Sequence, residues 1–98
     1  MALDTVDRGM LQRMIDDAIE DIDAWIQFSR RPEQKSRLQL KEEGDFVLGL
    51  TWGRVLGTFT ANFAISHRRR LNSEEQHDLY DAVNKRTGEI RKAIFKSG

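Results

Sequence analysis

The stretch Gly49-Leu-Thr-Trp-Gly-Arg-Val-Leu-Gly57 places three glycines four residues apart in the most apolar part of the chain. Inside a helix or a strand, each glycine lowers stability by about 0.5–1 kcal/mol relative to alanine. Residues four apart lie on one face of a helix, so this spacing predicts a helix with one face made of small residues.

On a helical wheel, residues 46–66 form a bulky side, a side of small residues and a weakly polar side that holds Arg54, Thr51, Thr58 and Asn62. Arg54 is the only charged residue between Phe46 and Ser66. We therefore expect most of this helix to be buried, and Arg54 to pair with an acid from the N-terminal helix or from a second copy. A groove of small residues lets another helix approach until the backbones touch. The sequence thus predicts a helix–helix or dimer contact at Gly49, Gly53, Gly57 and Ala61.

Two other interpretations of this region remain open. Residues 36–66 could form a β-meander in which Gly53 and Arg54 make a two-residue hairpin turn, which would give an α+β fold of helix, meander and helix. The region could also be a membrane span, but a charge near its middle costs about 2.5–3.5 kcal/mol, so we do not expect a membrane location.

The flanking segments have helical periodicity. Apolar residues recur at steps of three and four over residues 5–29, and Pro32 marks a break after them. A second pattern covers residues 73–97, with Ser73 and Gln76 at the spacing of a capping box. We therefore expect an all-α fold of three helices, in which the largely buried central helix completes a dimeric bundle.

Composition limits the class of protein. The 98 residues are 39% hydrophobic and 33% charged, which is typical of one globular domain over residues 1–98. The absence of cysteine excludes disulfides and thiolate metal sites, and fits a cytoplasmic location. The N-terminus does not resemble a secretory signal. Net charge is zero, but residues 4–30 hold seven acids and three bases, whereas residues 64–98 hold five acids and eight bases.

Three stretches, "DFVLGLTWGRVLGTF", "RRRLNSEEQ" and "NKRTGEIRKAIF", resemble small uncharacterised proteins of ammonia-oxidising archaea. The resemblance covers roughly residues 38–96. It implies a helical fold and no particular activity.

No catalytic motif is present in the sequence, and we expect no enzyme activity and no cofactor. The carboxylates of Asp16, Glu20 and Asp23 share one helical stripe, which we interpret as a solvated face. Glu74 and His77 have the spacing used in di-iron bundles but lack the further ligands. His67 lies beside three arginines, whose charge opposes a cation, so we expect no metal site.

The basic residues are the other candidate for function. Two groups could form one patch that contacts phosphates or an acidic partner: Arg30, Arg31, Lys35 and Arg37, with Arg68, Arg69 and Arg70. No aromatic residue is interleaved to stack on bases. We therefore expect a small self-associating interaction protein, a homo-oligomer, and keep a nucleic-acid-associated accessory factor as the alternative.

Overall fold

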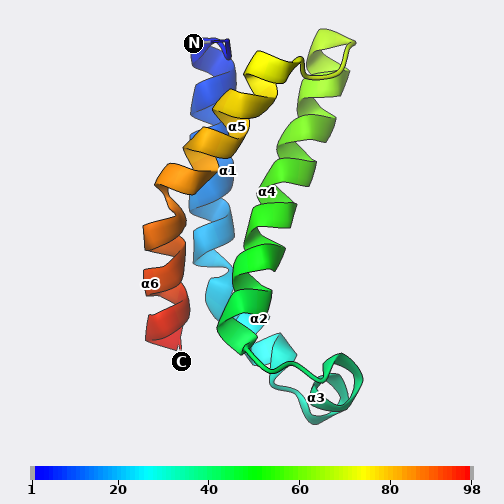
Figure 1. Cartoon of the computed structure of the whole chain (residues 1–98), viewed down its shortest axis with the longest axis vertical. Coiled ribbons are helices and arrows are strands. Elements are labelled where there is room, and N and C mark those ends of the chain that lie inside the picture. The colour runs from blue at the N-terminus through cyan, green and yellow to red at the C-terminus, as the bar shows by residue number, and fades with distance from the viewer. Residues whose placement is uncertain (1, 98) are drawn as a thin grey trace.

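The computed structural model describes residues 2–97, and within this range all regular structure is helical (Figure 1). The helices are α1 (Thr5–Glu20), α2 (Ile22–Ser29), α3 (Pro32–Leu38), α4 (Glu43–His67), α5 (Ser73–Lys85) and α6 (Thr87–Ser97). The all-α expectation is confirmed. The hairpin and the β-meander are wrong, because α4 runs without a break through both proposed strands and the proposed turn.

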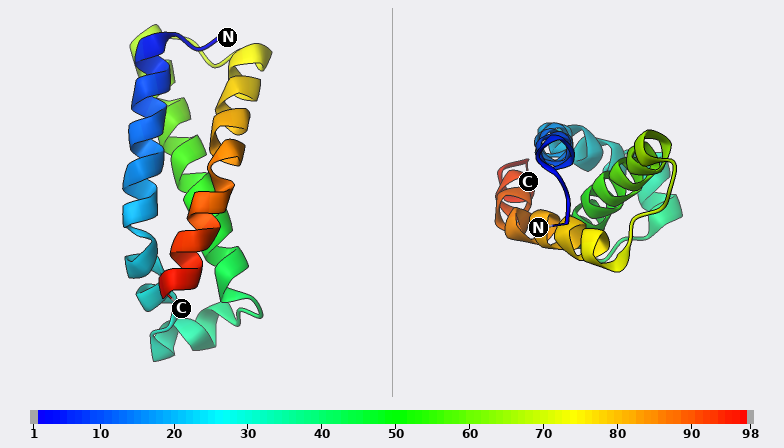
Figure 2. Two further views of the ribbon diagram at one scale, coloured as in Figure 1. Left: turned by 90° about the vertical axis from the view of Figure 1, so that its left-hand side faces the viewer. Right: turned by 90° about the horizontal axis from the view of Figure 1, so that it is seen from above.

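The helices form three long arms. α1 continues into α2, α5 continues into α6, and α4 lies beside both pairs (Figures 1 and 2). The short α3 packs against α2 at one end of the molecule. The prediction of three helices is therefore wrong in its count, because the described residues form six. Both predicted outer helices are broken, at Asp21 and at Arg86, and the segment after the expected break at Pro32 folds as the additional short helix α3.

These breaks separate two hydrophobic clusters. The first lies among α1, α4 and α5 and is built around Ile15, Phe59 and Val83, and the second lies among α2, α4 and α6 and is built around Ile26 and Ile90. The half-buried Ile19 and Trp52 pack against both clusters. The straight α4 spans both, whereas each outer arm changes direction between them.

Polar contacts hold the outer arms at the breaks. The Arg86 guanidinium donates to the backbone oxygen of Gln12 at 3.2 Å and forms ion pairs with Asp16 at 2.6 Å and Glu89 at 2.9 Å. These pairs raise the pKa of Arg86, with the hydrogen bond to Glu89 as the largest cause. In addition, Trp52 Nε1 donates to Thr87 Oγ1 at 3.1 Å, so the first residue of α6 is fixed to α4.

The predicted helix starts are close to those observed. The Asp4 side chain caps α1 by accepting from Asp7 N at 2.8 Å. The capping box of α5 is made by Asn72 and Glu75, one residue before the predicted pair of Ser73 and Gln76, which is therefore wrong. Asn and Ser are nearly equal as N-caps, so the local sequence alone does not separate the two starts. The observed partner Glu75 also accepts hydrogen bonds from Arg69.

Burial of α4 is limited to one stripe. Its buried residues recur at every fourth position: Val47, Thr51, Val55, Phe59 and Phe63. The expectation of a largely buried helix is wrong for the single chain, because only two other arms cover α4. Thr51, expected on the weakly polar side, is buried and donates its hydroxyl to Val47 O at 2.8 Å.

Candidate interaction surface

The face of small residues on α4 is open. Gly49, Gly53, Gly57 and Ala61 are all exposed. A Cβ atom added at any of the three glycines would meet nothing within 4 Å. The aligned glycines therefore do not pack against another helix of the same chain, and within one chain the prediction of a close helix contact is wrong.

A groove adjoins this face between the second half of α4 and α5. It encloses about 630 Å³. The apolar side chains of Leu56, Leu71 and Leu79 line it together with the small residues Gly57 and Ala61 of α4. Tyr80 on the α5 wall is 49% exposed, which is high for a large hydrophobic side chain. Figure 2 shows that α4 and α5 are joined by the loop after α4 at this end of the molecule.

The two residues that flank α4 carry opposite charge. Glu42 precedes the helix, and Arg68 directly follows it in a left-handed conformation with φ of 55°. Both side chains are exposed and neither forms an ion pair with another residue in the range 2–97. With 25 residues, α4 is about 37 Å long, so the two charges are well separated.

The only charge within α4's apolar run is held by an acid. Arg54 forms an ion pair with Asp21, which lies at the junction of α1 and α2, at 2.5 Å. The predicted pairing with an acid of the N-terminal segment is confirmed. The Arg54 side chain is nevertheless 36% exposed, so the pair lies at the surface and not in a buried environment.

The seven basic residues predicted as one patch lie in two groups. Arg31, Lys35 and Arg37 are exposed on or beside α3, near the start of α4, whereas Arg68 to Arg70 follow its end. Two members already bind acids, since Arg30 pairs with Glu43 at 2.8 Å and Arg69 with Glu75 at 2.7 Å. The hydrogen bonds that each arginine donates to its acid raise the pKa of the arginine. The structure thus does not bring the seven together into one phosphate-binding surface.

Comparisons with family models, with curated proteins and with solved structures found no match to this chain. The resemblance to proteins of ammonia-oxidising archaea therefore stays a prediction. Within residues 2–97, no helix, including α4, has the combination of length and apolarity needed to cross a membrane.

Proposed function

We propose that the protein is a small self-associating interaction protein, whose dimer interface is the open face of α4 and the groove beside it. The observation that carries the proposal is the row of small residues, which three glycines leave bare on a 25-residue helix. Each glycine weakens the helix by about 0.5–1 kcal/mol relative to alanine, and close approach of a second helix would offset that cost.

The positions of the small residues are symmetric about the centre of α4. The helix Glu43–His67 has Val55 at its midpoint. An antiparallel crossing of two copies at this point sets Gly53 of one copy against Gly57 of the other, and Gly49 against Ala61. A two-fold rotation exchanges the two copies and leaves this set of pairs unchanged, as an isologous dimer requires.

Charge complementarity favours the same arrangement. In the antiparallel register the residue before each α4 lies beside the residue that follows the other α4, which brings Glu42 of one copy near Arg68 of the second. The groove of each copy would then receive the first half of its partner's α4. The proposal includes no catalytic step.

Sedimentation velocity over a range of protein concentrations tests the proposal. We expect the wild type to form dimers and Gly53→Leu to weaken dimerisation by at least about tenfold, which corresponds to 1.4 kcal/mol. In the single chain Gly53 is exposed and a Cβ atom added there meets nothing within 4 Å, so the variant should fold. Gly88→Leu is the matched control, because a Cβ at this exposed glycine of α6 also meets nothing within 4 Å. A wild type that stays monomeric, or a Gly53→Leu variant that dimerises normally, would refute the proposal.

A charge exchange tests the antiparallel register. Glu42→Arg and Arg68→Glu should each weaken dimerisation, because each places like charges together at both ends of the interface. The double variant should recover much of the lost affinity. If the double variant is as weak as the sum of the single variants, the two residues do not meet across the interface.

A further inference from the structure

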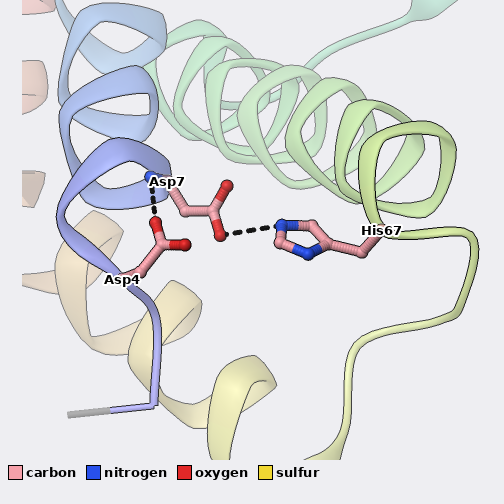
Figure 3. Close-up of side chains that lie close together, drawn as sticks. All are labelled: Asp4, Asp7 and His67. Atoms are coloured by element: carbon pink, nitrogen blue, oxygen red, sulfur yellow. Dashed lines mark hydrogen bonds and ion pairs between the residues drawn. The ribbon is translucent and has the colours of Figure 1, made fainter.

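Side chains about 60 residues apart in the sequence meet where α1 begins and α4 ends. Asp4 is the N-cap of α1, Asp7 lies in its first turn, and His67 is the last residue of α4 (Figure 3). One ligand-type atom from each of the three lies within 4.8 Å of the others. Asp7 Oδ2 is 3.0 Å from His67 Nε2.

Asp7 is a buried carboxylate with one oxygen that makes no hydrogen bond within the described range. Asp7 is 6% exposed, which is unusual for an aspartate. Its Oδ2 atom binds His67, whereas its Oδ1 atom makes no hydrogen bond to any residue in the described range. No buried side-chain oxygen there lacks a partner, so Oδ1 keeps some contact with solvent, and a small ion can reach the carboxylate from that side.

The other two ligands are held in place by separate contacts. Asp4 uses only Oδ1 to cap α1, which leaves Oδ2 for another partner. The imidazole of His67 is stacked on Phe63 with ring centroids 4.1 Å apart. Both positions therefore depend on contacts that ligation of an ion would leave intact.

The local charges permit a divalent cation. Two carboxylates and a neutral imidazole match its charge. Of the three arginines that follow His67, Arg69 lies over the Phe63 ring and donates to both oxygens of Glu75, which offsets its positive charge. Arg68 and Arg70 are exposed, so water and salt screen their charges. Arg8 donates to the backbone oxygen of Asp4 at 3.4 Å. His67 also stands at the negative end of the α4 dipole.

We propose that Asp4, Asp7 and His67 bind a first-row divalent cation, with Zn²⁺ as the best fit to one imidazole and two carboxylates. Tetrahedral Zn²⁺ with ligands at about 2.0–2.1 Å separates neighbouring ligand atoms by about 3.3 Å. The observed 3.0 Å between Asp7 and His67 is close to this value, so small side-chain movements complete the site. Three protein ligands leave a fourth position for water or an external ligand. The ion would fasten the start of α1 to the end of α4.

Calorimetric titration of the tag-free, chelator-treated protein with ZnCl₂ at neutral pH tests the site. We expect one Zn²⁺ per chain, and a loss of affinity of about tenfold or more in His67→Gln and in Asp4→Ser. Serine keeps the N-cap oxygen, so Asp4→Ser removes a ligand without removing the cap. His77→Gln is the matched control, because His77 is the other histidine of the chain and lies exposed on α5.

Imidazole NMR spectra identify the ligand directly. Addition of ZnCl₂ should shift the ring nitrogen signals of His67 and leave those of His77 unchanged. Failure to bind Zn²⁺ at millimolar concentration, a shift confined to His77, or wild-type affinity in Asp4→Ser would each overturn the proposal. The self-association proposal does not depend on these results, because the site lies within one chain.

Discussion

At the scale of single residues, the ion pair between Arg69 and Glu75 has a clear electrostatic consequence. The hydrogen bonds from Arg69 lower the pKa of Glu75 to about 2, from an ordinary value of 4.5. A carboxyl group with a depressed pKa in the folded state stabilises the fold above its unfolded-state pKa, and this stabilisation disappears as the pH falls through the folded value. The contribution of Glu75 is therefore complete above about pH 5 and lost between about pH 4.5 and 2.

Glu75→Gln isolates this effect, since glutamine can still complete the capping box with Asn72. We expect the variant to melt at a lower temperature than the wild type at pH 6, and the difference to shrink as the pH falls toward 2. Asp81→Asn is the control, because Asp81 is exposed on the same helix and pairs with Lys85 at the surface. Thermal melts followed by circular dichroism at pH 6, 4 and 2.5 measure the difference. A gap between wild type and Glu75→Gln that does not change with pH would contradict the assignment.

Some contacts of single residues could be predicted from the sequence, and others could not. A lone charge in an apolar run needs a partner, and this argument led correctly to an acid near Arg54. The exposure of the pair depends on which face of α4 its neighbours cover, which no local pattern specifies. The meeting of Asp7 and His67 across 60 residues was missed for the same reason, since it follows from how the two helices lie side by side.

At the scale of elements, α4 shows why a helical wheel misplaced some of its faces. Its buried residues are four apart, and each step of four advances about 40° around the helix. The buried stripe therefore winds around α4, because α2 and α6 cover its first half and α1 and α5 its second half. A wheel assumes neighbours that run straight along the helix, and so it placed Thr51 outside the core. The existence of the helix, which depends on composition and periodicity alone, was predicted correctly.

The short helix α3 differs from the others because none of its residues is buried. Its start is set by Pro32 and its end by Gln39 in a left-handed conformation with φ of 50°. Local opening of this segment exposes little apolar surface, so its free energy should be small. We expect the backbone amides of α3 to exchange with deuterium much faster than those around Val55 and Phe59 in α4.

Hydrogen exchange followed by mass spectrometry measures this contrast. The first turn of α5 is an internal reference, because the capping box stabilises it. Protection in α3 equal to that in the middle of α4 would contradict the expectation. It would indicate that α3 is covered, for example in a dimer larger than the α4 interface requires.

At the scale of the whole molecule, a 98-residue chain has two hydrophobic clusters but one continuous helix that belongs to both. The sequence predicted a single domain. The breaks at Asp21 and Arg86 separate the two clusters, so the α1–α5 cluster and the α2–α6 cluster could unfold together or one after the other. Val47 of α4 lies in one cluster and Val55 in the other, only two turns apart, and Trp52 contacts both. Loss of either cluster would leave half of α4 without support. We therefore expect both clusters to unfold in one transition.

A core substitution in one cluster, read out in the other, tests this cooperativity. Phe59→Ala removes a fully buried side chain of the first cluster and should lower the free energy of unfolding by about 3–5 kcal/mol. Trp25 packs against the second cluster alone, so in a Trp52→Phe background its fluorescence reports that cluster. In urea titrations, Phe59→Ala should shift the Trp25 transition and the circular dichroism transition to the same lower midpoint. Ile90→Ala, in the second cluster, should likewise move both signals together. A Trp25 midpoint that stays at its original value in Phe59→Ala would show that the α2–α6 half folds without the other, and that the chain consists of two cooperative units joined by α4.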